Sequence, residues 1–165
     1  MKALGIDPGT ATTGYGILEN DGDNVQVVDY GCIRTSSKDS SSDRLKKIYS
    51  DVAKLISKHK PKCVAVEKLF FGQNTKTAMA VGQARGVVIL AASQAGLEIA
   101  EYTPLEVKMA LTGYGRADKK QMQQMVKRLL KMNILPTPDD AADALAVALC
   151  HMNSDGFNSR TREIK

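Results

Sequence analysis

Cysteine, histidine and long apolar runs are scarce in this sequence, and each scarcity narrows the class of protein. The three cysteines form no CxxC pair, so they give no sign of disulfide or metal chemistry, and we expect small buried side chains in a reducing cytosol: Cys32, Cys63 and Cys150. The two histidines, His59 and His151, argue against a zinc site. No run approaches the length of a membrane span, and the N-terminus is too weakly apolar for a signal peptide. We therefore expect a cytoplasmic protein that has no membrane anchor.

Acidic residues are scarce over one long stretch. The formal net charge of +5 is modest and is weak evidence by itself for a polyanionic partner. Between residues 108 and 131, however, basic side chains face only Glu106 and Asp118 nearby: Lys108, Arg116, Lys119, Lys120, Lys127, Arg128 and Lys131. Such a run is usually a solvated helix face. Its single sign also favours contact with a phosphate backbone.

The hydrophobic pattern predicts an α/β fold with a mixed five-stranded sheet flanked by helices on both faces. Strands are expected at 2–7, 14–19, 25–33, at "KCVAVE" ending in Glu67, and at 98–102. Helices are expected after a Ser-rich loop with Ser42 or Asp43 as N-cap, and then at 75–94, from Pro104, at 118–132 and at 139–152. Residues 1–152 then form one domain, and 153–165 form a polar, disordered tail.

Small residues recur at four-residue intervals in the helix predicted at 75–94. Ala78, Gly82 and Gly86 fall on one stripe. Glycine inside a helix costs up to about 1 kcal/mol relative to alanine, so the stripe calls for a reason. Close packing on the sheet is one interpretation, and a close helix–helix contact across a dimer is the other.

The chain opens with an acid at the end of a buried strand, in "GIDPGTATTGYGIL". Pro8, Gly9 and the threonines account for a turn, but they do not account for Asp7. A carboxylate in such a place is costly to desolvate unless positive charge meets it. Two interpretations fit: a phosphate-binding turn of the actin-like ATPase kind, or a metal ligand in a nuclease.

Three further acids favour the metal. Glu67 ends a strand that we expect beside the first, so both carboxylates leave the same sheet edge. Asp140 and Asp143 are three residues apart on one face of the last helix, and capping can explain Asp140 but not Asp143. Converging carboxylates suit hard divalent cations, Mg²⁺ or Mn²⁺. Two such ions can activate water and stabilise the departing oxygen of a phosphodiester.

Three segments together resemble the RuvC family of Holliday junction resolvases: "GIDPGTATTGYGIL", "VAVEKLFFGQNTKTAMAVGQARGV" and "DDAADALAVALCH". The resemblance covers residues 1–152. It implies a ribonuclease-H-like fold, a homodimer, and Mg²⁺-dependent symmetrical nicking of four-way DNA junctions in recombination and repair. It also implies the RuvA–RuvB branch-migration complex as partner. Asp7, Glu67, Asp140 and Asp143 match the family's catalytic metal ligands.

The resemblance also implies DNA contacts. Phe70 matches an aromatic placed against bases near the crossover, and Lys108 and Lys119 match basic positions near the scissile phosphates. This sequence has Lys68 directly after the second acid and doubles the aromatic with Phe71, which is either core or DNA-facing. We interpret "TGYGRADKK" as a loop that places Arg116, Lys119 and Lys120 near phosphates.

Three other functions compete with this interpretation. An actin-like ATPase closes two domains around its nucleotide, whereas this chain holds one domain and would leave Asp140 and Asp143 without a role. A ribonuclease-H-fold nuclease acting on RNA is disfavoured by the small-residue helix and the aromatic loop. A junction-binding protein with an inactive site is disfavoured by the four intact acids.

Overall fold

The mixed five-stranded sheet predicted from the sequence is confirmed in a computed structural model, which describes residues 1–22, 24–68 and 75–162. Its strands are β1 Lys2–Asp7, β2 Thr12–Asn20, β3 Val25–Arg34, β4 Cys63–Glu67 and β5 Glu98–Tyr102, in the order β3-β2-β1-β4-β5. The first three strands form an antiparallel meander. β4 runs parallel to both β1 and β5. Because β1 and β4 are neighbouring parallel strands, their carboxyl ends lie side by side.

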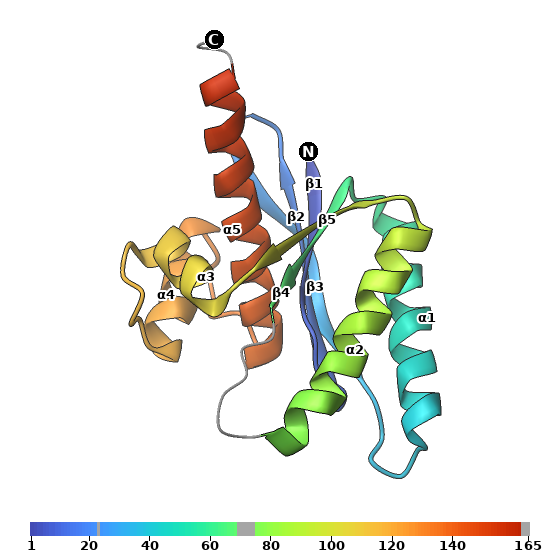
Figure 1. The fold of residues 1–165 in the computed structure, drawn as a ribbon. Helices are drawn as coiled ribbons and strands as arrows, with labels where there is room; N and C mark the ends of the chain where they lie inside the picture. Colours follow the sequence, from blue (N-terminus) through green and yellow to red (C-terminus); the bar gives the residue numbers. More distant parts are fainter. Residues whose placement is uncertain (23, 69–74, 163–165) are drawn as a thin grey trace.

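Helices cover both faces of this sheet, as expected (Figure 1). One face carries α1 Ser41–His59 and α2 Thr75–Gln94, and the other carries α3 Pro104–Thr112, α4 Lys119–Leu129 and α5 Asp139–Arg162. Each face has its own buried apolar cluster. Within the described ranges, no helix combines the length and apolar character needed to cross a bilayer.

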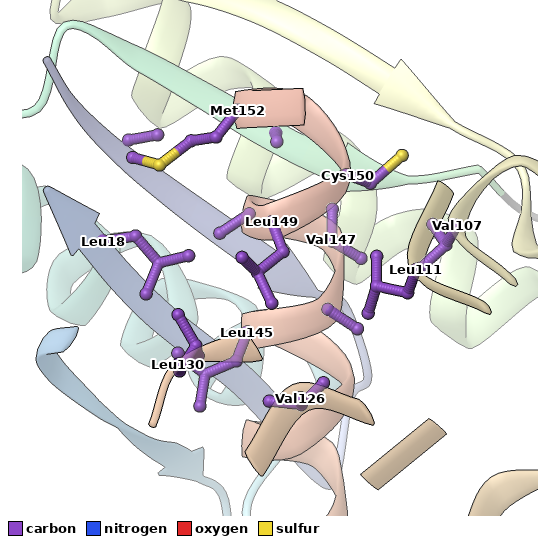
Figure 2. Close-up of a cluster of buried hydrophobic side chains, with 14 of the residues drawn as sticks. Leu18, Val107, Leu111, Val126, Leu130, Leu145, Val147, Leu149, Cys150 and Met152 are labelled. Atoms are coloured by element: carbon purple, nitrogen blue, oxygen red, sulfur yellow. The ribbon is translucent and has the colours of Figure 1, made fainter. Parts of the chain in front are cut away.

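The cluster under α5 holds the functional face together. Leu145 and Leu149 of α5 point toward Leu18 of β2, while Val107 of α3 and Val126 of α4 close the cluster from the other side (Figure 2). All five side chains are buried. Burial of a leucine or valine side chain contributes roughly 1.5–3 kcal/mol, so this cluster fixes α3 and α4 against α5.

α5 lies directly on the strand backbone because glycines face it. A Cβ atom at Gly5 of β1 would lie 2.2 Å from the Ala144 carbonyl oxygen, and one at Gly14 of β2 would lie 1.9 Å from the Asp140 carbonyl oxygen. No other residue type fits at either place without moving the helix. The first turns of α5 are thereby seated against the ends of β1 and β2.

Two boundary predictions are wrong. The N-cap of α1 is Ser40, whose Oγ accepts the Asp43 N–H at 3.1 Å, so Asp43 lies within the first turn. α5 ends at Arg162 and not at the predicted 152, while the disordered tail stays a prediction. A helix that is already nucleated gains one hydrogen bond per added residue, so polar residues prolong it at little cost.

Not every residue of the small-residue stripe in α2 (Ala78, Gly82 and Gly86) packs on the sheet. The buried positions of α2 are Ala84, Val88, Ala91 and Ala92. Gly86 is exposed, and a Cβ atom there would have no neighbour within 4 Å among the described residues. Sheet packing is therefore excluded as the reason for Gly86, and the contact with a second copy stays a prediction.

Candidate active site

Asp7 and Glu67 lie at the carboxyl ends of adjacent parallel strands. Ile6 of β1 is in register with Val66 of β4, so the next residue on each strand is one of these two acids. The prediction that both carboxylates leave the sheet at the same edge is confirmed. Because a parallel pair brings like ends together, the repulsion between the two acids follows from the topology of the sheet.

The first turns of α5 bring two more carboxylates to this edge. Gly14, which is paired with Asp7 across β1 and β2, lies directly under Asp140. Asp143 follows one helical turn later and lines a cavity together with Glu67. Both α5 acids act on Asp7 electrostatically. Four acids distant in the sequence therefore meet at one place.

Burial and mutual repulsion change the ionisation of this cluster. Burial, followed by the charges of Glu67, Asp143 and Asp140, raises the pKa of Asp7 from 3.8 to about 7. Burial and then Asp143 raise the pKa of Glu67, even though a hydrogen bond with Asp7 opposes that shift. Burial also raises the pKa of Asp143. A hydrogen bond joins the Asp7 and Glu67 carboxyl groups.

The chemistry of this cluster fits a hard divalent cation, because all of its donors are carboxylate oxygens whose charges repel one another. Among the residues that the structure describes, no group of three or more Asp, Glu, His or Cys side chains is already arranged to share one ion. Neither histidine belongs to the cluster, since His59 pairs with Asp29 and His151 contacts Cys63 and Tyr102.

Two lysines stand beside the acids. The Lys119 Nζ lies 3.1 Å from the Asp139 Oδ2 and 3.6 Å from the Asp143 Oδ2. Lys108 lowers the pKa of Glu67 from across the same cavity, which has a volume of about 210 Å³. The floor of that cavity is apolar and consists of Val107, Met122 and Ala146. Acids, lysines and an apolar floor form a cleft that suits a phosphodiester strand.

The other predicted DNA-binding residues lie further away or outside the description. Arg116 and Lys120 are exposed in the α3–α4 loop and the first turn of α4, and Lys120 lines a different cavity from the acids. Phe70 lies outside the described residues, as does Phe71. The structure therefore brings Lys108 and Lys119 to the acids but leaves Arg116 and Lys120 outside their cavity.

Hydroxyl groups of the opening turn are used inside the protein. The Thr13 hydroxyl donates to the Gly9 carbonyl oxygen at 2.7 Å, and the Thr10 hydroxyl donates to the Ala80 carbonyl oxygen of α2 at 2.8 Å. A phosphate-binding turn would direct these groups toward its ligand. The turn instead fixes the chain after Asp7, which favours the carboxylate cluster over a nucleotide site.

Sequence reasoning missed two residues. Asp139 pairs with Lys119 and accepts from the Gln123 side-chain amide at 2.8 Å. Tyr114, within "TGYGRADKK", is 56% exposed and precedes the basic residues of that segment. The two glycines that flank this aromatic were the available signal, because such a segment forms a turn that displays its central side chain.

Known proteins similar to this chain point to one family. The family described as Crossover junction endodeoxyribonuclease RuvC matches residues 3–151. The protein of that name from Halothermothrix orenii is 56% identical over 160 residues, which cover 97% of this chain and 97% of the relative. The one from Alkaliphilus metalliredigens is 57% identical over 159 residues, covering 96% and 97%.

The fold of a solved relative agrees closely. Thermus thermophilus RuvC in complex with Holliday junction substrate superposes with a TM-score of 0.91 at 34% identity, covering 96% of each chain. The yeast mitochondrial Holliday junction resolvase Ydc2, at 13% identity and a TM-score of 0.70, shares the fold. The ribonuclease-H-like fold expected from the resemblance is thus confirmed, and the chain belongs to the RuvC family of crossover junction endodeoxyribonucleases.

Proposed function

We propose that this protein is a crossover junction endodeoxyribonuclease that resolves four-way DNA junctions by paired, symmetrical nicks. The observation that carries the proposal is the convergence of Asp7, Glu67, Asp140 and Asp143 at one sheet edge, beside Lys108 and Lys119. Carboxylates can hold divalent cations and ammonium groups can bind phosphates, so this combination suits metal-dependent hydrolysis of a phosphodiester. Hydrolysis leaves a 5′-phosphate and a 3′-hydroxyl.

The four carboxylates are the proposed cation ligands. Mg²⁺, with Mn²⁺ as a substitute and two ions per site, supplies an activated water and a counter-charge for the departing oxygen. Asp7 and Glu67 would hold the cations from the sheet edge. Asp140 and Asp143 would complete the ligand set from a helix whose backbone lies against Gly5 and Gly14.

The two lysines have distinct roles in this proposal. Lys119 pairs with Asp143 in this structure, and with a cation held by Asp143 its ammonium would be available to a phosphate of the DNA. Lys108 faces Glu67 across the cleft and binds the strand on the opposite side. Charge-assisted hydrogen bonds of this kind hold the phosphodiester in line for attack.

Paired nicks require two sites, and the proposed dimer contact is the exposed face of α2. Met79 is 75% exposed and Leu90 is 50% exposed, and both lie on the same face of the helix as Gly86. An apolar stripe with a glycine at its middle suits close approach by a second copy of the helix. The family resemblance adds the RuvA–RuvB complex as a partner at the junction.

The decisive experiment incubates the purified protein with a synthetic four-way DNA junction, with and without Mg²⁺, and maps the nicks on every strand. We expect Mg²⁺-dependent cuts at symmetrical positions on two opposed strands. Asp7→Asn should bind the junction with nearly unchanged affinity and make no cuts.

The same assay separates the competing functions. Cleavage of structured RNA in preference to the junction would identify a ribonuclease. Binding without cleavage by the wild-type protein would identify an inactive junction-binding protein. Calorimetric detection of ATP binding would favour the ATPase interpretation.

A further inference from the structure

An exposed aromatic side chain is held on a fixed backbone beside the candidate active site. Tyr114 follows Gly113, which ends α3 in the left-handed conformation at φ 68°. The Tyr114 N–H donates to the Thr112 hydroxyl at 3.0 Å, and its carbonyl oxygen accepts the Ala117 N–H at 3.2 Å. Although the backbone is held on both sides, the side chain is 56% exposed. This geometry displays the phenol ring rather than packing it.

The ring borders a cavity of about 520 Å³ between the α3–α4 loop and α4. That volume falls within the range of roughly 300–1,000 Å³ typical of small-ligand sites. Met125 and Ala117 supply apolar surface and Gln124 supplies a side-chain amide, whereas the Gln121 side chain accepts the Asp118 N–H in the helix cap. A ring, apolar surface and an amide are the groups that bind a nucleobase by its face and its edge.

Two consecutive residues at the start of α4 connect this cavity with the acid cluster. Lys119 reaches Asp143 in the active site, whereas Lys120, the next residue, lines the cavity beside Tyr114. The α4 N-terminus is already capped by Asp118, which accepts the Gln121 N–H at 2.8 Å. Positive charge in the cavity lining therefore comes from the Lys120 side chain rather than from free backbone N–H groups.

We propose that this cavity is a nucleobase-binding subsite, in which an unpaired base of the cleaved DNA strand stacks on Tyr114 while Lys120 binds its phosphate. The inference rests on the proposed function, because it requires a DNA strand at the acids. A strand held by Lys119 at the active site continues past Lys120, so the subsite reads a nucleotide a short distance from the scissile phosphate.

Charge decides between DNA and a protein partner as the occupant. Lys120 lines the cavity and Lys119 precedes it in the chain; Asp118, the acid in the lining, is engaged in the helix cap. A phosphate-bearing strand complements that charge, and it already passes Lys119 in the proposed mechanism. A peptide would have to compete with the strand for the same surface.

The test places 2-aminopurine at successive positions on each side of the nick in a four-way junction and measures its fluorescence when the protein binds with Ca²⁺ in place of Mg²⁺. We expect a strong change at one position with the wild-type protein and with Tyr114→Phe. The change should be lost with Tyr114→Leu, whose junction affinity should fall by about five- to tenfold. Met109→Ala, an exposed apolar neighbour that does not line the cavity, is the matched control and should behave as wild type.

An abasic substitution at the responsive position then tests direct contact. It should weaken wild-type binding about as much as Tyr114→Leu does, and it should add little in the Tyr114→Leu variant. Equal affinity of wild type and Tyr114→Leu, or an abasic penalty that is the same in both, would overturn the subsite. Failure of the wild-type protein to nick the junction in Mg²⁺ would instead refute the proposed function, and that result is independent of the fluorescence.

Discussion

Asp7 is one of the buried carboxyl groups through which pH acts on the ion-free protein. Burial, Glu67 and the two α5 acids raise its pKa from 3.8 to about 7. Between those two values the folded protein keeps a proton that the unfolded chain has lost. The unfolded state therefore binds fewer protons, and the free energy of unfolding falls as pH rises through this window.

Removing that ionisation should stabilise the ion-free protein. In the presence of EDTA, we expect Asp7→Asn to raise the melting temperature at about pH 8 and to have little effect at about pH 5, where Asp7 is already neutral. A shift of about three pKa units corresponds to roughly 4 kcal/mol, which sets the upper scale of the gain. Thermal unfolding followed by circular dichroism measures it. An equal gain at both pH values would show that charge burial is not the cause.

Lys119 should have opposite effects on cation binding and on DNA cleavage. Because its ammonium pairs with Asp143, Lys119→Met should tighten the binding of Mn²⁺ to the free protein, as measured by titration calorimetry. The same variant should cut junctions more slowly and lower the slope of log affinity against log salt by about one.

Lys120→Met is the matched control for this pair of effects. Its side chain lies in the Tyr114 cavity, away from the acids, so Mn²⁺ binding should stay unchanged while junction binding weakens. If both lysine variants changed Mn²⁺ affinity equally, general charge rather than the Asp143 contact would be responsible.

Single residues also mark how far the sequence alone could reach. Asp7 and Glu67 could be placed together because strand ends and acids are both local signals, and parallel pairing joins them. The contacts of Lys119 with Asp139 and Asp143 could not be predicted, since they depend on how α4 packs on α5 through buried apolar residues. The sequence identifies the acids, whereas the packing of α4 on α5 decides which lysine side chain lies beside them.

At the scale of elements, the placement of α5 decides the geometry of the site. Gly14→Ala would put a methyl group where the Asp140 carbonyl oxygen now lies. Such overpacking costs about 1–3 kcal/mol, and it should lift Asp140 away from Asp7. We expect a lower unfolding free energy in urea together with loss of junction cleavage.

Gly86→Ala serves as the control for that substitution, since its added methyl group meets no atom of the chain within 4 Å in the described structure. It should leave the free energy of unfolding of the monomer unchanged or raise it by up to about 1 kcal/mol. If Gly14→Ala were as stable and active as wild type, the close seating of α5 would not matter to the site.

Element boundaries show where local signals compete. Several serines in succession offered equivalent N-caps, and tertiary placement of α1 selected Ser40 over Ser42. The polar residues after 152 gave no stop signal strong enough to end α5, which continues to Arg162. By contrast, α2 and β5 begin and end where the pattern placed them, because apolar periodicity and Gly or Pro punctuation agree there.

For the molecule as a whole, the exposed stripe of α2 predicts an assembly. Leu90→Glu should convert the proposed dimer into a monomer in sedimentation velocity, because a charge would replace apolar contact on a face that is half exposed in the single chain. The monomer should keep its fold and Mn²⁺ binding but lose paired cutting of junctions. A wild-type protein that sediments as a monomer would contradict this arrangement.

α5 lies directly on the strand backbone at Gly5 and Gly14, so no side chain separates the helix from the sheet there. The two glycines beneath α5 join Asp140 and Asp143 to the sheet as firmly as Asp7, which is part of it. Differences in reactivity between conditions must then arise from the mobile partners of this rigid frame, namely protons, cations, lysine side chains and the DNA itself. An inhibitor of this enzyme should therefore be designed to fit the backbone arrangement of β1 and α5 seen here, because that arrangement is expected to stay the same between conditions.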